Sequence, residues 1–197
     1  MGCPHENFEY HDLIECITTA VDVRDPYTGE HSLRVGDMAL LLCQSLGLSE
    51  EETNIIHIAG HVHDIGKIGV PDTILLKNGC LNSYEWDLVK KHPKIGADIL
   101  SKSDKLTDIA NLVLHHHERY DGEGYPSGLK GEDIPLGARI IAVCDSIDAM
   151  SSERAYRSAM PLEVVRMEIH NNIGTMYDPD IAIIALKEWE NILKLYE

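Results

Sequence analysis

The sequence lacks most of the features that mark membrane, secreted or metal-ribbon proteins. None of its 197 residues belongs to a run approaching the roughly 18 to 20 apolar residues that a bilayer span requires, and no targeting signal is evident. The five cysteines are scattered and form no C-x-x-C pair, which argues against a disulfide framework and a zinc ribbon. A soluble protein without a membrane span, in the reducing cytoplasm, is therefore expected.

Positive charge is also scarce. Seventeen Lys and Arg residues stand against 33 Asp and Glu residues, so the formal net charge is −16. Such a surface repels phosphate backbones and anionic lipid, and nucleic-acid polymers are not expected as partners. A small anionic substrate requires bound metal ions and a few well-placed cations that make one pocket locally positive.

Sustained strand alternation is absent, whereas apolar residues recur at helical spacing along nearly the whole chain. We expect an all-α fold in one domain, residues 1–197, in which residues 1–25 form an N-terminal helix that continues from an upstream connection. Gly47 ends one predicted helix, and Ser49 with Glu52 forms a capping box that begins the next. The predicted helices cover residues 13–21, 33–46, 49–64, 84–91, 94–101, 105–117, a segment from 138, 162–171 and 178–195.

The segment 121–137 interrupts this pattern. It holds five glycines and two prolines, too many for regular secondary structure. We therefore predict a long surface loop, a kind of segment that is commonly functional.

Eleven histidines are present, and several stand beside aspartates. Imidazole and carboxylate together suit divalent iron, manganese or zinc, and a carboxylate can bridge two ions. Asp145 follows the apolar run 140–144, so helical burial places a carboxylate against the core, which is costly unless a cation compensates it. Cys144 is interpreted as small core packing rather than a catalytic thiol. A catalytic metal site is therefore predicted.

Spacing alone leaves the ligands open. His57, His61 and Asp64 share one helix face, and any two of the three histidines at 115–117 would serve.

Two motifs supply a resemblance. The stretch HDIGKIG at 63–69, followed by HHERYDGEGYP at 116–126, resembles the HD-GYP family, a branch of the HD phosphohydrolases. The similarity extends from DPYTGEH at 25–31, through IPLGAR at 134–139, to Gly174 and the Asp178-Pro179 pair. It implies an HD-domain helical bundle with a long GYP loop.

The resemblance also implies a set of metal ligands with Asp64 as the bridge, while His57, His61 and His115 take ordinary structural roles. Family members with a third metal use a glutamate where this chain has Tyr27, and Glu30 would point away around a helix. Two divalent ions, iron or manganese, are therefore expected. The implied ligands are His31, His63, Asp64, His92, His116, His117 and Asp145.

The implied reaction is hydrolysis of cyclic di-GMP to linear pGpG, with further cleavage to GMP left open, by attack of a hydroxide that bridges the metals. Asp64 and Lys67 are the predicted catalytic residues, and Lys67 would also hold a substrate phosphate, although a helix C-terminal cation is its ordinary role. Arg154 and Arg157 resemble positions that contact phosphate or guanine, against the alternative of solvated surface cations. Glu118 and Arg119 are predicted to support the site.

Two alternatives share these residues: a hydrolase acting on a different nucleotide, and a catalytically weak or silent nucleotide-binding signalling module. The resemblance further suggests that the loop contacts a GGDEF-domain protein. The predicted partner residues are Gly122, Gly124, Tyr125 and Pro126.

Overall fold

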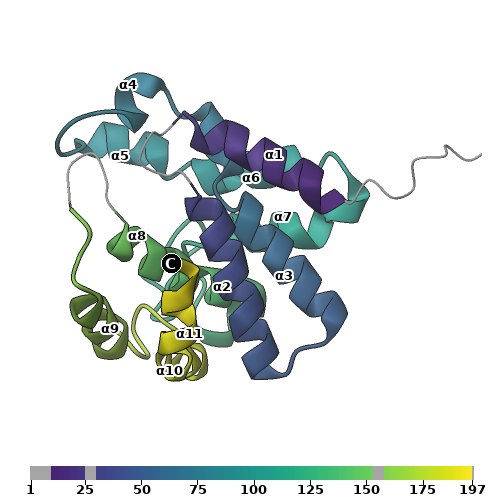
Figure 1. Ribbon diagram of the computed structural model, residues 1–197. Helices are drawn as coiled ribbons and strands as arrows, with labels where there is room; N and C mark the ends of the chain where they lie inside the picture. The colour runs from purple at the N-terminus through teal and green to yellow at the C-terminus, as the bar shows by residue number, and fades with distance from the viewer. Residues whose placement is uncertain (1–9, 25–29, 153–157, 197) are drawn as a thin grey trace, which may run out of the picture.

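The computed structural model describes residues 10–24, 30–152 and 158–196, and these ranges form an all-α structure (Figure 1). No strand occurs in the described part of the chain, where Ile173 and Tyr177 make one isolated bridge. The predicted fold class is confirmed. Within the same ranges, no helix is both long and apolar enough to cross a membrane.

Several helices begin and end at the predicted signals. Helix α2 (His31–Leu46) ends at Gly47, whose φ of 73° is left-handed. Helix α3 (Glu50–Val62) begins with the predicted capping box, because the Ser49 hydroxyl accepts from the Glu52 N–H while the Glu52 carboxylate accepts from the Ser49 N–H. The Asp178 carboxylate caps α10 (Pro179–Lys187) in a similar way.

Helices α2 and α3 lie side by side at the centre of the molecule (Figure 1). Helix α1 (Tyr10–Asp22) lies across the end at which α2 begins and α3 finishes. The other face of α2 packs against α8 (Leu136–Ser151), and Met38 of α2 and Ile140 and Ile141 of α8 are fully buried. Each buried aliphatic side chain contributes about 1.5–3 kcal/mol, so this interface holds the two helices firmly.

The remaining elements are short and surround this pair. The loop at 121–137 is confirmed as mostly irregular, with one 3₁₀ turn, η3 (Gly131–Asp133), and α8 begins at Leu136, two residues before the predicted start. The other helices are α4 (Asp72–Leu75), α5 (Ser83–Val89), α6 (His92–Leu100), η2 (Asp104–Leu106), α7 (Thr107–His115) and α9 (Leu162–Asn171).

The chain after α3 differs from the prediction of one helix continuing to Asp64. Helix α3 ends at Val62, and a 3₁₀ helix, η1 (Ile65–Gly69), follows Asp64. In a 3₁₀ helix, residues three apart eclipse one another. Lys67 therefore still lies over Asp64, although not for the α-helical reason that the spacing suggested.

The predicted helix 178–195 is also wrong in one respect, because it is broken at Glu188. The ψ of Glu188 is 8°, and a new helix, α11 (Trp189–Leu193), follows and ends in the turn η4 (Lys194–Tyr196). The break directs the chain back against α2, where the Tyr196 ring lies 5.3 Å from the Arg34 guanidinium. No glycine or proline marks this position, so tertiary packing decides it.

Candidate functional site: a histidine and aspartate centre

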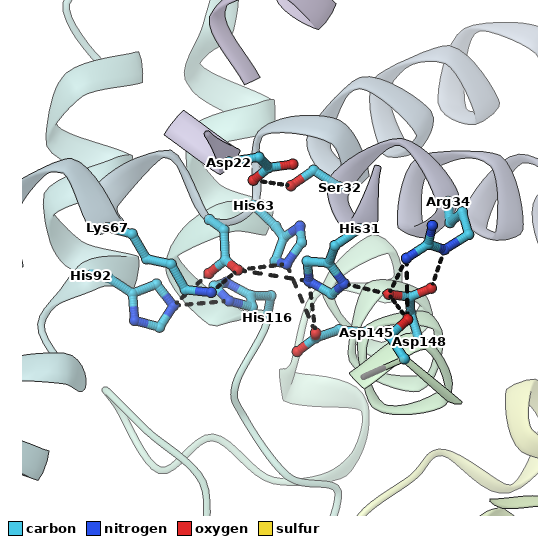
Figure 2. A network of polar contacts seen from close by, with 12 residues as sticks. Asp22, His31, Ser32, Arg34, His63, Lys67, His92, His116, Asp145 and Asp148 are labelled. Carbon is cyan, nitrogen blue, oxygen red and sulfur yellow. Dashed lines mark hydrogen bonds and ion pairs between the residues drawn. The ribbon is translucent and has the colours of Figure 1, made fainter. Parts of the chain in front are cut away.

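Two histidines from different helices meet at one side of the site. His31 is the first residue of α2, and His63 directly follows α3. Their rings lie 5.2 Å apart edge to face (Figure 2). Both Nε2 atoms are directed at the carboxylates of Asp64 and Asp145, 3.3 to 3.9 Å away. The first cluster therefore combines two imidazoles with two carboxylates.

Three further histidines form the second cluster. His92 begins α6, while His116 and His117 follow α7. The Nε2 atoms of His92 and His116 are 3.3 Å apart, and the His117 ring lies 5.0 Å from that of His92 and 4.0 Å from that of His116. Three nitrogens of this group could bind one metal ion.

Asp64 lies between the two clusters. Its Oδ1 is 3.2 Å from Nε2 of His92, and its Oδ2 is 3.3 Å from Nε2 of His63. The two oxygens of one buried carboxylate thus face opposite groups of imidazoles. A carboxylate in this position can bridge two ions.

The orientation of three of these rings is set by helix-end carbonyls. Nδ1 of His63, His92 and His116 each donates to the carbonyl three residues earlier, at 2.7, 2.8 and 2.7 Å. Because a carbonyl only accepts, Nδ1 carries the proton and Nε2 turns its lone pair towards the centre. The terminal turns therefore direct these Nε2 atoms at the centre.

His31 is oriented by a carboxylate instead. Its Nδ1 lies 2.6 Å from Oδ2 of Asp148, and the opposite oxygen of Asp148 accepts from Nε of Arg34 at 2.6 Å (Figure 2). Asp148 is fully buried, and the pKa of its carboxyl is lowered to about 2, because His31 and Arg34 outweigh the effect of burial. The sequence analysis missed this residue. It lies three positions after Asp145 in the same apolar helix, so the reasoning applied to Asp145 would have found it.

The two clusters differ in the direction in which the pKa values of their groups are shifted. Burial raises the pKa of Asp64, but Lys67 and His63 offset this and hold it well below its usual value. Burial lowers the pKa of His31, yet Asp145 and Asp148 outweigh it and raise the pKa to about 9. In the second cluster burial and the neighbouring imidazoles act together, so the pKa of His117 falls to about 3. One cluster is thus rich in anionic ligands and the other in neutral ones.

The residues fit divalent metal ions. Nε2 of His31 and Nε2 of His63 are buried and have no hydrogen-bond partner among the described residues. Buried polar atoms are almost always paired, and a cation supplies the missing partner. Neutral imidazoles with carboxylates suit borderline divalent metals, and cysteine is absent from both groups. The clusters could therefore bind metal.

Gly66 allows the clusters to approach one another. A Cβ at this position would lie 1.9 Å from the His92 carbonyl oxygen and 2.5 Å from the Gly96 nitrogen, so η1 rests directly on the backbone of α6. This contact brings Asp64 within reach of His92. Glycine in the HDIGKIG stretch is thus required by close packing.

Lys67 is the predicted substrate-binding residue that the structure describes. Nζ of Lys67 lies 2.5 Å from Oδ2 of Asp64, at the edge of the centre. Arg154 and Arg157 lie outside the described residues, as does Tyr27. Glu30 is 79% exposed and lies 3.8 Å from Arg34, so its carboxylate does not face the centre.

A family model described as HD domain matches residues 15–181 of the sequence. The chain belongs to the HD domain family. The predicted resemblance is thereby confirmed at this level.

Relatives of this HD domain chain carry names that match the activity implied by the HD-GYP resemblance. It is 41% identical over 194 residues to "Cyclic di-GMP phosphodiesterase" of Thermotoga maritima, covering 98% of this chain and 52% of the relative. It is 44% identical over 170 residues to "Cyclic di-GMP phosphodiesterase response regulator RpfG" of Xanthomonas campestris pv. campestris, covering 85% and 45%. This chain therefore spans about half the length of these curated relatives.

A solved structure confirms the fold. The crystal structure of a cyclic GMP-AMP specific phosphodiesterase of Vibrio cholerae superposes with a TM-score of 0.74 at 21% identity, covering 94% of this chain and 50% of that one. At 21% identity this similarity shows a shared fold.

The GYP loop of this HD domain is fixed from inside. The Glu118 carboxylate, 3% exposed, accepts from the backbone N–H groups of Ser127 and Leu129 at 2.7 and 3.1 Å. Glu118 thus holds the loop through these two bonds, and its predicted support of the metal ligands stays a prediction. Arg119 instead pairs with Asp121, 2.5 Å away.

The predicted partner residues divide between the two sides of this loop. The half-buried Tyr125 lies with its ring 4.9 Å from that of His117, and burial raises the pKa of its hydroxyl. Gly122 and Gly124 are also half-buried, whereas Pro126 is exposed. The loop therefore covers the second cluster and presents only part of its surface outwards.

The candidate histidines that the resemblance does not assign as metal ligands make other contacts. Nδ1 of His115 donates to the Asn111 carbonyl at 3.0 Å. His57 and His61 form a separate pair between α2 and α3.

Proposed function

We propose that the chain is a binuclear metal-dependent phosphodiesterase that hydrolyses cyclic di-GMP to the linear dinucleotide. The observation that carries the proposal is the position of Asp64, whose two oxygens face separate histidine clusters. Two relatives are named as cyclic di-GMP phosphodiesterases, which supports this substrate. The chain matches about half of the length of each relative. Iron or manganese fits the donor set, which contains only imidazole and carboxylate.

The proposed ligands divide into two groups that share Asp64. His31, His63 and Asp145 would hold one ion, and the second cluster would hold the other. Divalent ions, when bound, lower the pKa of water and neutralise charge on a phosphodiester. The protein's own part is to orient the ligand nitrogens, which the helix-end carbonyls and Asp148 do. The second group consists of His92, His116 and His117.

Lys67 is proposed to bind a substrate phosphate. Its ammonium lies at the edge of the centre against Asp64, with a side chain 19% exposed, so it can meet an incoming anion without leaving the site. Against a net charge of −16, a fixed cation here would help to make the pocket locally attractive. Arg154 and Arg157 are proposed to add contacts to phosphate or guanine.

The decisive experiment incubates protein loaded with Mn²⁺ or Fe²⁺ with cyclic di-GMP and follows linear pGpG by chromatography. Asp64→Ala is expected to reduce turnover by more than about 100-fold, because loss of outer partners alone costs about 10–100-fold in such sites. Lys67→Ala is expected to lower kcat by about 100-fold while metal content stays unchanged. Lys94→Ala, a surface lysine of α6 that is 63% exposed, is the control.

The outcomes separate the alternatives. If the metal-loaded wild type forms no product with either metal, the proposal that the chain is an enzyme is contradicted. Binding of cyclic di-GMP without turnover would then indicate a silent nucleotide-binding module. Faster hydrolysis of 3′,3′-cyclic GMP-AMP than of cyclic di-GMP would reassign the substrate. Equal loss of metal and turnover in Lys67→Ala would assign Lys67 to site integrity.

A GGDEF-domain protein is proposed as a partner of the GYP loop. The exposed side of the loop, which includes Glu123 and Pro126, supports this. A pull-down with Pro126→Ala as the weakened variant tests it, and equal capture of wild type and variant would contradict it.

A further inference from the structure

Helices α2 and α3 touch through their backbones at one crossing. A Cβ on Gly60 would lie 2.9 Å from the Cα of Gly36, so neither helix has a side chain between them here. A Cβ on Gly36 would lie 2.5 Å from two ring atoms of His61. The two glycines therefore allow the His61 imidazole to lie directly against the backbone of α2.

Two histidines of α3 are directed at α2 across this crossing. Nδ1 of His57 lies 2.9 Å from the Gly36 carbonyl oxygen, and Nδ1 of His61 lies 3.2 Å from that of Ser32. Because carbonyl oxygens only accept, both Nδ1 atoms act as donors. The opposite nitrogens, Nε2 of His57 and Nε2 of His61, then face each other at 3.2 Å. At that distance the two nitrogens are spaced as two ligands of one metal ion.

The geometry matches coordination of one metal ion. Two nitrogens that each lie about 2.05 Å from a tetrahedral zinc are about 3.3 Å apart. The proposed catalytic pair, His92 and His116, shows the same arrangement, with both Nδ1 atoms on carbonyls and the Nε2 atoms 3.3 Å apart. The pair on α3 thus has the local features of a ligand pair outside the catalytic centre.

A carboxylate completes the group. Asp37 of α2 offers an oxygen, and it and the two imidazole nitrogens all lie within 4.8 Å of one another. Asp37 is exposed, His57 is half-buried and His61 is 1% exposed. An ion can therefore enter from solvent past Asp37 and stop against the buried ring.

We propose that Asp37, His57 and His61 bind a divalent transition-metal ion, with zinc as the best match, at a site separate from the catalytic centre. Two imidazoles and one carboxylate leave a fourth tetrahedral position for water. The ion ties α2 to α3, and these helices lead to His31 and to His63 with Asp64 respectively. Its occupancy therefore stabilises the elements that deliver one cluster.

Metal stoichiometry tests the site without reference to activity. The protein is loaded with Mn²⁺, exposed to a slight excess of Zn²⁺ and passed through gel filtration, and all metals are counted by mass spectrometry. Counting the total allows for exchange of zinc into the catalytic centre. The variants His57→Gln and Asp37→Asn are expected to hold one ion fewer per chain than the wild type. His170→Gln, an exposed histidine at the end of α9, is expected to match the wild type.

The variants avoid the buried His61 so that folding is preserved, and circular dichroism after chelation checks that His57→Gln and the wild type unfold alike without metal. Equal metal counts in wild type and both variants would overturn the proposal. Turnover is measured on the same samples, so a chain without phosphodiesterase activity that still loses one ion in His57→Gln contradicts the proposed function alone.

Discussion

Two aspartates one helical turn apart in α8 have different tasks at the residue scale. Asp145 is 16% exposed and faces the imidazoles of His31 and His63, whereas Asp148 is fully buried and faces the far side of the His31 ring. A carboxylate behind a ligand histidine fixes its tautomer and raises its basicity. Asp148, held by Arg34, would therefore orient His31 towards a bound ion without contacting that ion itself.

Asp148→Asn should weaken metal affinity by about 10–100-fold. The amide keeps the shape of the side chain but removes the negative charge that His31 and Arg34 share, and Nδ1 of His31 loses its strongest acceptor. Competition against a chromophoric chelator measures the affinity. Asp98→Asn on the surface of α6, where Asp98 pairs with Lys94, is the control. An unchanged affinity in Asp148→Asn would exclude the positioning role.

At the scale of elements, helix ends build the site. His63, His92 and His116 each satisfy a carbonyl in a terminal turn, where intrahelical partners run out. The 3₁₀ turn after Asp64 brings Lys67 over it, and the irregular loop after His117 is closed by Glu118. The ends of elements, rather than their middles, thus present most of the functional groups.

Glu118→Gln should loosen the GYP loop. The carboxylate accepts two backbone N–H groups, and hydrogen bonds to a charged acceptor are worth about 1.5–3 kcal/mol. Glutamine can turn only one oxygen to these donors. Amide hydrogen exchange at Ser127 and Leu129 is therefore expected to accelerate at least about tenfold.

The control for this measurement is Glu123→Gln, an exposed carboxylate of the same loop. It should leave the exchange of Ser127 and Leu129 unchanged. If Glu118→Gln exchanges no faster than Glu123→Gln, the loop is held by other contacts.

For the whole molecule, the centre connects elements that are distant in the sequence. The candidate ligands come from α2, the end of α3, α6, the end of α7 and α8. Bound ions would link these five parts of the chain, and they would compensate acidic groups in a protein with a net charge of −16. Metal binding would therefore be coupled to folding.

Removal of metal should lower the midpoint of thermal unfolding. An ion at a free concentration 100-fold above its Kd stabilises the folded state by about 2.7 kcal/mol, which is roughly 5–10 °C for a chain of this size. Circular dichroism with and without a chelator measures the shift, and restoration by Mn²⁺ distinguishes metal loss from damage by the chelator. Identical midpoints would contradict the coupling.

Local signals in the sequence determined the class of fold and many of its boundaries. The capping box at Ser49, the glycine after α2 and the cap at Asp178 act within a few residues, so they can be recognised without the tertiary structure. The motif resemblance likewise identified the histidines and aspartates that meet in the centre, although their roles as ligands stay a prediction.

Only the tertiary structure decided how these groups face one another. Asp148 and His31 are 117 positions apart, and their contact depends on the packing of α2 against α8. The two oxygens of Asp64 face different clusters because η1 packs on the backbone of α6. His57 and His61 contact α2 because the backbones of α2 and α3 cross at Gly36. Helical periodicity gives the face of each helix but not its neighbour, because interhelical contacts arise from shape and packing along the whole molecule.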